Sequence, residues 1–471
     1  ICGPGREARE PLAFETLLEV PRTTSPRWIS SLSQDRRRVA NQQTAYTRAS
    51  TFADNSNNPY FGRHRDGFGD CVAATRGVDS GVAGESVAEN GKAISMDSPG
   101  ERAGAALKAA ARSEIASFMV MDVMAAAARL EAQGRRIVHL EVGQPGTGAP
   151  RSAREAAKRA IDDEALGYTL ALGMPALRER LAQHYKDTYG VDVGPERIVI
   201  TNGSSAGFVL AFLALFNAGD AVAVPSPGYP CYRNILTALG QPYVAIETDA
   251  AGRWMPTVSQ IEAAGDIRGL LIASPNNPTG TMIEPDRLAA LVDWCVRSGR
   301  WFISDEIYHG LSFGKPATTA LATSQDAIVI NSFSKYFSMT GWRVGWLVVP
   351  QDLVAAFERL AQNLFICAPA VSQAAALGAF DGRDELEENV ARDARNRAFL
   401  MENLPNVGFD ELVPADGGFY LYADVGRFTN DSLAFSRVML DEAGVAATSG
   451  VDFDETRGTR YLRFSYAGTY E

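Results

Sequence analysis

The sequence predicts an α/β fold, with a mainly parallel sheet flanked by helices and a second, smaller α+β domain. Two observations predict it. From residue 153 onward, short runs rich in β-branched and aromatic residues alternate with helical stretches, which is the pattern of parallel strands joined by helices. The polar, small-residue motifs that stand out along the chain directly follow such runs, and ligands in sheets of this kind bind at the carboxyl ends of strands.

Differences in composition divide the chain into four segments. The first is rich in Ser, Asn, Gly and Arg with weak apolar periodicity, and the first methionine is Met96, so we expect a disordered or extraneous upstream extension. A targeting peptide fits poorly, because the segment has no apolar core of a secretory signal. The expected segments are this extension at 1–95, an N-terminal arm with part of the small domain at 96–150, the large domain at 151–360 and the smaller C-terminal domain at 361–471.

The individual elements follow from periodicity and from stop residues. Apolar residues at helical spacing predict a helix over 101–133 that ends at Gly134, and a short strand over 136–142. The remaining strands are expected at 197–201, 221–225, 242–246, 270–273, 301–304, 327–331 and 344–349.

Charge and composition exclude several functional classes. The chain carries 45 Lys and Arg against 56 Asp and Glu, a net charge of −11, which argues against nucleic acid and anionic membranes as partners. The longest apolar run, 207–216, is about half the roughly 20 residues that a membrane span needs. Five cysteines without a C-x-x-C pair favour a reducing cytoplasm, and four histidines without metal-ligand spacing predict no metal site.

One lysine lies in a segment unlike a protein surface. Lys335 follows the strand expected at 327–331, within a stretch of aromatic, small and hydroxyl-bearing residues at 331–345. Most lysines are solvated surface charges, but an ammonium group is costly to bury in this setting unless it is used. Burial also lowers the pKa of a lysine and makes it a nucleophile toward aldehydes.

Two further motifs follow strands upstream. Asp305 comes directly after the strand at 301–304, and 274–280 reads Ser-Pro-Asn-Asn-Pro-Thr-Gly after the strand at 270–273. Taken alone, the first is explained as a helix cap and the second as a rigid turn. The three motifs in this order are much more specific than any one of them.

Together, the three segments resemble the class I/II aminotransferases, which are fold type I enzymes that use pyridoxal 5′-phosphate. The resemblance covers about residues 110–471. It implies a ping-pong transfer of an amino group between an L-amino acid and a 2-oxo acid, with 2-oxoglutarate and glutamate as one pair. It also implies a homodimer with shared active sites.

The resemblance assigns roles to residues around the cofactor ring. It implies that Lys335 holds the cofactor as a Schiff base and moves the substrate's proton, and that Asp305 pairs with the pyridine nitrogen. It implies that Asn277 and Tyr308 hydrogen-bond the phenolic oxygen of the cofactor and that Tyr229 stacks on the ring.

The resemblance also assigns residues to the anionic groups. For the cofactor phosphate these are the helix N-terminus at Gly203, Ser204 and Ser205, the side chains of Ser332, Ser334 and Arg343, and Tyr168 of the neighbouring subunit. For the substrate α-carboxylate they are Arg463, Asn277 and Gly143, the glycine permitting a close backbone approach.

Two departures from the family pattern and three alternatives stay open. Residues 146–148 read Gly-Thr-Gly where relatives often carry an acid and an aromatic, so side-chain specificity is open, and we expect the small domain to be truncated because relatives usually continue past the strand of Arg463. A C–S lyase or a cyclopropane-forming synthase would use the same lysine. A ligand-sensing regulator would need a DNA-binding domain, but 1–95 shows neither periodic helices nor a basic face. A structural protein without catalysis would leave the joint occurrence of the motifs unexplained.

Overall fold

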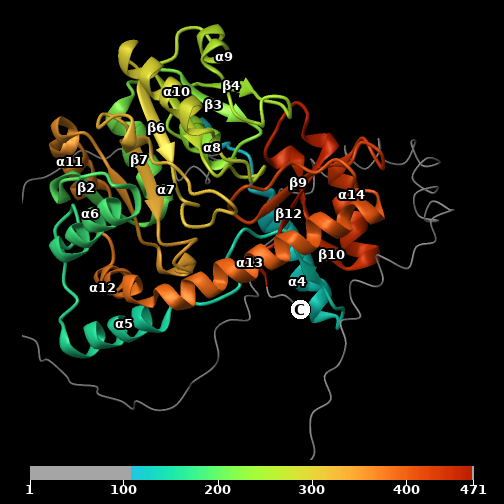
Figure 1. The fold of residues 1–471 in the computed structure, drawn as a ribbon, viewed down its shortest axis with the longest axis horizontal. Coiled ribbons are helices and arrows are strands. Elements are labelled where there is room, and N and C mark those ends of the chain that lie inside the picture. Colours follow the sequence, from blue (N-terminus) through green and yellow to red (C-terminus); the bar gives the residue numbers. More distant parts are fainter. Residues whose placement is uncertain (1–107, 469–471) are drawn as a thin grey trace, which may run out of the picture. The chain divides into compact units, whose positions relative to one another are not determined.

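The computed structural model describes residues 108–468 (Figure 1). The expectation for residues 1–95 lies outside these residues, and the division of the chain into four segments stays a prediction. Within the described part, no helix is long and apolar enough to cross a membrane.

A seven-stranded sheet forms the centre of the larger part of the fold. Its strand order is β2-β8-β7-β6-β5-β3-β4, and only β8 runs antiparallel to its neighbours, so the predicted mainly parallel sheet is confirmed. All seven predicted strands are present with bounds within one residue of those expected. The strands are β2 (Ile198–Thr201), β3 (Val222–Ser226), β4 (Tyr243–Glu247), β5 (Gly269–Ala273), β6 (Trp301–Asp305), β7 (Ile328–Ser332) and β8 (Gly345–Val348).

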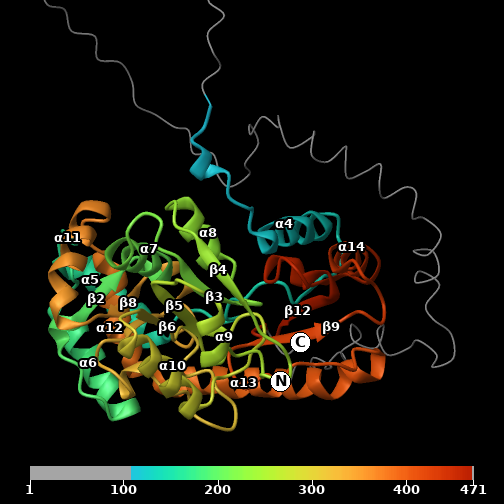
Figure 2. The ribbon, with the colours of Figure 1, turned by 90° about the horizontal axis from the view of Figure 1, so that it is seen from above.

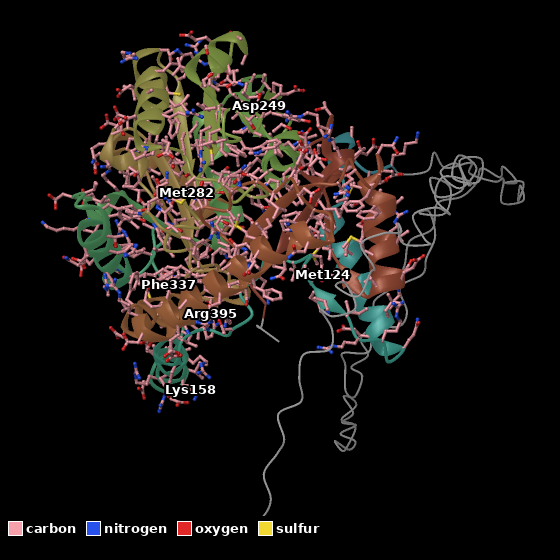
Figure 3. The ribbon with its side chains drawn as sticks, turned by 45° about the vertical axis from the view of Figure 1, so that its right-hand side comes forward. Met124, Lys158, Asp249, Met282, Phe337 and Arg395 are labelled. Atoms are coloured by element: carbon pink, nitrogen blue, oxygen red, sulfur yellow. The ribbon has the colours of Figure 1, made fainter. Side chains whose placement is uncertain are left out.

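Helices cover both faces of this sheet (Figure 2). Successive residues of one strand point to opposite faces, so Leu270 and Ile272 join one core cluster and Leu271 joins the other. One face packs against α5 (Arg151–Asp163), α6 (Pro175–Tyr189), α9 (Val258–Ala263), α10 (Pro285–Arg297) and α12 (Ala370–Ala379). The other packs against α7 (Gly203–Leu215), α8 (Cys231–Ala238) and α11 (Val354–Leu364). Figure 3 shows Lys158 of α5 at the periphery, whereas Met282, only 2% exposed, lies inside.

A smaller α+β part lies beside the sheet. Its antiparallel sheet has the order β11 (Thr448–Ser449), β12 (Tyr461–Ser465), β9 (Tyr420–Asp424). Its helices are α4 (Met119–Ala132), α13 (Arg383–Asn403) and α14 (Ser432–Val438). The strand β1 (Val138–His139) pairs in parallel with β10 (Val445–Ala446), so an N-terminal segment packs against the C-terminal part of the chain.

The two N-terminal elements are shorter than predicted. The helix expected over 101–133 begins only at Met119, and between residues 108 and 118 the structure has a single 3-10 turn at Ala111–Ser113. Ser113, Ile115 and Ser117 have lower helix propensity than the alanines before them, and Phe118 is extended with its ring against Tyr229. The strand expected over 136–142 is reduced to two residues, because carbonyl groups that follow it bond to side chains of the site described next.

Candidate active site

The motifs predicted from the sequence meet at one edge of the central sheet. Asn277 follows β5, Asp305 is the last residue of β6, and Lys335 follows β7. Because these three strands are adjacent and parallel, their carboxyl ends lie side by side. The strand order therefore brings together three side chains that are far apart in the sequence.

Lys335 is held in a mostly aromatic setting. Its Nζ donates to the carbonyl oxygen of Gly143 at 2.7 Å. The same nitrogen lies 5.7 Å from the ring centre of Tyr308 and 5.6 Å from that of Phe419. Burial, and secondarily the charge of Arg463, lowers the pKa of Lys335 to about 8, which makes the neutral amine accessible near physiological pH.

Asp305 is a buried carboxyl group, only 3% exposed. Its Oδ2 accepts a short hydrogen bond from the hydroxyl of Tyr232, and its Oδ1 accepts from the backbone N–H of Ile307 at 3.1 Å. Burial raises the pKa of Asp305 to about 6, and both hydrogen bonds act against that shift. A cationic ring nitrogen beside it would stabilise the ionised form.

Arg463 on β12 is a buried cation, only 1% exposed. Its Nη1 donates to Asn277 Oδ1 at 2.9 Å, and its Nη2 makes a short bond to the carbonyl of Glu141. Its guanidinium lies 4.3 Å above the ring of Tyr420. Among residues 108–468 it forms no ion pair, and its Nε has no hydrogen-bond partner. A buried charge of this kind calls for an anionic ligand.

Two tyrosines join the two parts of the fold across the site. The hydroxyl groups of Tyr308 and Tyr420 are 2.9 Å apart. The space beside Tyr420 is so tight that a Cβ added to Gly143 would lie 1.6 Å from its hydroxyl oxygen. Gly143 is therefore required by a close approach of its backbone to this phenol.

A second positively charged region, besides that of Arg463, lies at the N-terminus of α7. Gly203 has φ +75° there, and a Cβ added to it would lie 2.2 Å from Nη2 of Arg343. Ser332 and Ser334 at the end of β7 lie with their hydroxyl oxygens 2.8 Å apart, and Ser204 and Ser205 form the first turn of the helix. A helix N-terminus, hydroxyl groups and a guanidinium without a carboxylate partner among the described residues fit a phosphate. The residues present thus fit pyridoxal phosphate at both of its ends.

Two of the predicted residues lie differently from those above. Tyr229 packs edge-on against Phe118 and Tyr232, with ring centres 5.9 and 5.4 Å away. Tyr168, in the turn before α6, is 84% exposed and is not brought into the site of its own chain. The role expected of Tyr168 at the site of a neighbouring subunit stays a prediction.

Besides Phe419 near Lys335, four contributors to the site were not predicted from the sequence. These are Tyr232, Tyr420, the carbonyl group of Glu141, and Phe118. Tyr232 had only a weak signal, since it follows Tyr229 by three residues but lies in the first turn of α8, whereas Tyr229 precedes the helix. The other three depend on contacts between distant segments. Across the described residues, no group of three or more His, Cys, Asp or Glu side chains is arranged to hold a metal ion.

Comparison with known proteins agrees with this geometry. The family described as aminotransferase class I and II matches residues 135–471. A valine–pyruvate aminotransferase of Mycobacterium tuberculosis is 49% identical over 366 residues, which cover 77% of this chain and 94% of the relative. The crystal structure of an aminotransferase from the same organism is 48% identical, with a TM-score of 0.76 and coverage of 77% and 95%. Thermus thermophilus aspartate aminotransferase with maleate is 29% identical, with a TM-score of 0.73 and coverage of 77% and 96%. The chain therefore belongs to the class I and II aminotransferases, and it is a pyridoxal-phosphate-dependent aminotransferase.

Proposed function

We propose that this aminotransferase transfers the amino group of an L-amino acid with a small apolar side chain, such as valine, to pyruvate, which yields alanine and the 2-oxo acid of the donor. The observation that carries the proposal is the guanidinium of Arg463, which lies in the site, is buried and forms no ion pair among the described residues, and so suits one carboxylate per substrate. The 49% identical relative named for valine and pyruvate supports the same choice.

A dicarboxylic substrate would need a second free cation near the first. Another arginine, Arg233, lines a hollow together with Tyr229 and Phe453. Arg233 is already used, because its Nε lies 3.3 Å from Glu455 and its Nη2 donates to the carbonyl of Asp452 at 2.7 Å. The pairing of 2-oxoglutarate with glutamate stays a prediction that competes with pyruvate in the same assay.

The proposed roles of the residues follow from their positions. Pyridoxal phosphate, when bound, supplies an electron sink for the bond that breaks at the α-carbon. Lys335 Nζ would attach the cofactor and later carry the α-proton from the substrate to the C4′ carbon of the cofactor, while Asp305 would keep the pyridine nitrogen protonated. Asn277 and Tyr308 hydrogen-bond the phenolic oxygen, and Tyr229 covers the ring. Gly203, Ser204, Ser205, Ser332, Ser334 and Arg343 bind the phosphate, and Arg463 with Gly143 and Asn277 binds the α-carboxylate.

Two measurements test this function. Purified protein is mixed with a panel of L-amino acids, and the 2-oxo acid released is identified together with the loss of visible absorbance of the bound cofactor. Release of 2-oxoisovalerate from valine, and regeneration by pyruvate faster than by 2-oxoglutarate, is the expected result. Faster regeneration by 2-oxoglutarate would replace pyruvate in the proposal, and pyruvate with ammonia or a thiol as products would indicate a lyase.

The second measurement concerns the lysine. Borohydride treatment of the loaded enzyme followed by peptide mass analysis should place the cofactor mass on the peptide that contains Lys335. The variant K335A, treated in the same way, is the control and should carry no label. Label on another lysine would refute the assignment.

We further propose a cytoplasmic homodimer in which Tyr168 reaches the phosphate site of the partner. Support comes from the 84% exposure of its side chain and from the free thiols of Cys231, Cys295 and Cys367, which suit a reducing compartment. Mixed dimers of two defective variants, Y168A and K335A, should recover activity, because one of the two sites then carries both native residues. Absence of recovery in dimers shown to have mixed would refute shared sites.

A further inference from the structure

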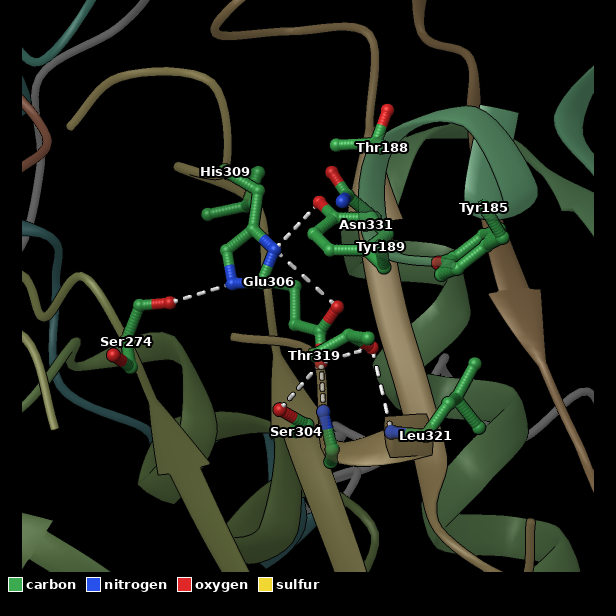
Figure 4. Close-up of polar contacts among 12 residues, drawn as sticks. Tyr185, Thr188, Tyr189, Ser274, Ser304, Glu306, His309, Thr319, Leu321 and Asn331 are labelled. Atoms are coloured by element: carbon green, nitrogen blue, oxygen red, sulfur yellow. Dashed lines mark hydrogen bonds and ion pairs between the residues drawn. The ribbon is translucent and has the colours of Figure 1, made fainter. Parts of the chain in front are cut away.

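A buried polar cluster surrounds Glu306 and His309, which are close in the sequence to Asp305 and Tyr308 (Figure 4). Asp305 ends β6, and Glu306 and His309 belong to the turn that follows it. Neighbouring residues point to opposite sides of an extended chain, so Asp305 bonds to Tyr232 of α8 whereas Glu306 bonds to Thr319 and Ala320 on the other side. The roles proposed above use neither Glu306 nor His309.

Glu306 is almost fully buried, at 1% exposed, and its two carboxyl oxygens differ in their hydrogen bonds. Its Oε1 accepts from Ser304 Oγ at 3.0 Å, from Thr319 Oγ1 at 3.1 Å and from the backbone N–H of Ala320 at 2.9 Å. Its Oε2 has no hydrogen-bond partner and lies 3.5 Å from Nδ1 of His309. An ionised carboxylate would leave this second oxygen buried and uncompensated.

His309 ties this carboxyl group to two other elements. Its Nε2 lies 3.1 Å from the carbonyl oxygen of Ser274, which can only accept, so Nε2 carries a hydrogen. Its Nδ1 lies 2.8 Å from the hydroxyl of Tyr189 on α6. In the neutral ring Nδ1 accepts from Tyr189 and offers nothing to Glu306. The Glu306 carboxyl group and the His309 ring together carry no net charge only when they hold one proton besides the hydrogen on Nε2. That proton lies either on Glu306 or on Nδ1 of His309.

Glu306 and His309 are linked to the two turns that carry the residues proposed to contact the cofactor. Ser274, at the end of β5, begins the turn that carries Asn277, and Tyr308 lies between Glu306 and His309 in the sequence. His309 therefore connects the two turns that carry Asn277 and Tyr308, the first through its hydrogen bond to Ser274 and the second through the backbone. We propose that Glu306 and His309 form a positioning pair, sharing one proton, which holds Asp305, Tyr308 and Asn277 in register beneath the cofactor. This inference rests on the residue roles proposed above.

The pKa values and the surroundings agree with this proton count. Burial raises the pKa of Glu306 to about 7 and lowers that of His309 to about 3, so below about pH 7 the shared proton lies on Glu306 and His309 is neutral. The titratable groups that face the pair are Asp305 on β6 and His184, Tyr185 and Tyr189 on α6. His309 and Tyr189 also line a hollow of about 920 Å³ that opens to solvent, which lets the pair equilibrate with the external pH.

The first test separates the tie to Ser274 from general packing. In the full-length enzyme, H309L removes the donor to Ser274, whereas H309Q keeps an N–H group that can reach the same carbonyl. H184Q is the matched control, because His184 lines the same hollow but contacts neither Ser274 nor Glu306. The readouts are the dissociation constant of pyridoxal phosphate and the thermal unfolding of the cofactor-free protein.

We expect H309L to weaken cofactor binding about tenfold, H309Q to restore it to within about threefold of the native value, and H184Q to leave it unchanged. Equal loss of thermal stability in H309L and H184Q with unaltered cofactor binding would reduce His309 to a core residue and overturn the proposal. So would a failure of H309Q to restore binding when it folds as well as the native enzyme.

The second test addresses the proton and serves if H309L does not fold. E306Q keeps an acceptor for Thr319 and Ala320 but cannot ionise. Above about pH 7 the native Glu306 gains a negative charge, which favours the protonated form of the bound cofactor, so its pH-dependent absorbance change should occur at higher pH than in E306Q. We expect a midpoint about half a pH unit lower in E306Q, with cofactor affinity at pH 6.5 retained.

An unchanged midpoint in E306Q would refute the proposal that Glu306 and His309 share a proton. Failure of the proposed function is a separate result. If the native protein binds the cofactor but does not transfer an amino group from valine to pyruvate, the proposed substrates are refuted, while the cofactor-binding measurements remain valid. Native protein that does not bind the cofactor at all would refute the site itself.

Discussion

Replacement of Gly143 by alanine tests the closest contact in the active site. The new Cβ would lie 1.6 Å from the hydroxyl oxygen and 2.6 Å from Cζ of Tyr420, both shorter than real Cβ contacts. Tyr420 cannot swing away at low cost, because its ring is 1% exposed, stacks on Arg463 and packs edge-on against Tyr308. Either this phenol or the backbone at residue 143 must move by more than an ångström.

Both ways of relieving the clash displace groups that face the substrate. If Tyr420 moves, its 2.9 Å link to Tyr308 and its stacking on Arg463 are lost. If the backbone moves, the 2.7 Å bond from Lys335 to the carbonyl of Gly143 is lost. Overpacking costs about 1–3 kcal/mol and a lost hydrogen bond about 1 kcal/mol. A total of about 2–4 kcal/mol corresponds to a fall of about 30- to 1000-fold in kcat/KM.

The assay is steady-state transamination of valine with pyruvate by G143A and by a matched control, G148A. Gly148 lies five residues further on, and a Cβ added there meets no atom within 4 Å. We expect G148A to retain kcat/KM within about threefold and G143A to lose it as calculated. A second substitution, Y420F, should recover part of the loss in the G143A background by removing the oxygen nearest the new methyl group. Equal activity of G143A and G148A would refute the reasoning.

Three further predictions concern the ionisable groups. In Y232F, Asp305 loses a hydrogen bond that lowers its pKa, so Asp305 becomes protonated at a higher pH as the solution is acidified. The acid-side midpoint of cofactor binding should therefore rise by about one pH unit. An unchanged midpoint would contradict this prediction. R463K keeps the charge but loses the forked geometry, so KM for the amino acid should rise about 10- to 100-fold, and a native KM would show that the carboxylate binds elsewhere. Because the pKa of Lys335 is about 8, reattachment of the cofactor to cofactor-free enzyme should accelerate between pH 7 and 9 and then level off, and a flat profile would count against the neutral amine as nucleophile.

The central sheet was predictable from the sequence because its inner strands are buried on both faces. β5 and β7 are buried at every position, and such strands are short apolar runs that need no partner to be recognised. The residues after them could be predicted as well, since a parallel sheet gathers its carboxyl ends whatever the order of the strands. Lys335, Asp305 and Asn277 therefore came from local motifs and were brought together by topology.

What the sequence missed depends on contacts between distant segments. Tyr420 becomes important only because β9 lies beside the turn of Tyr308, and neither segment signals the other. Carbonyl groups such as those of Glu141 and Gly143 carry no sequence signature, although they hold Arg463 and Lys335. For the same reason, the predicted strand at 136–142 was too long, since its alternation of residues did not reveal that side chains would take its hydrogen bonds.

The charges of the site link substrate binding to the reactivity of the lysine. Arg463 and Arg343 both lower the pKa of Lys335, and Asp305 raises it. A carboxylate bound at Arg463 would cancel the first of these effects, and a phosphate at Arg343 would cancel the second. Binding of the two anions proposed for the site would thus make Lys335 a stronger base, at the time when a proton must be taken from the α-carbon. The empty site favours the nucleophilic amine and the filled site favours the base, so one lysine can serve both proposed roles.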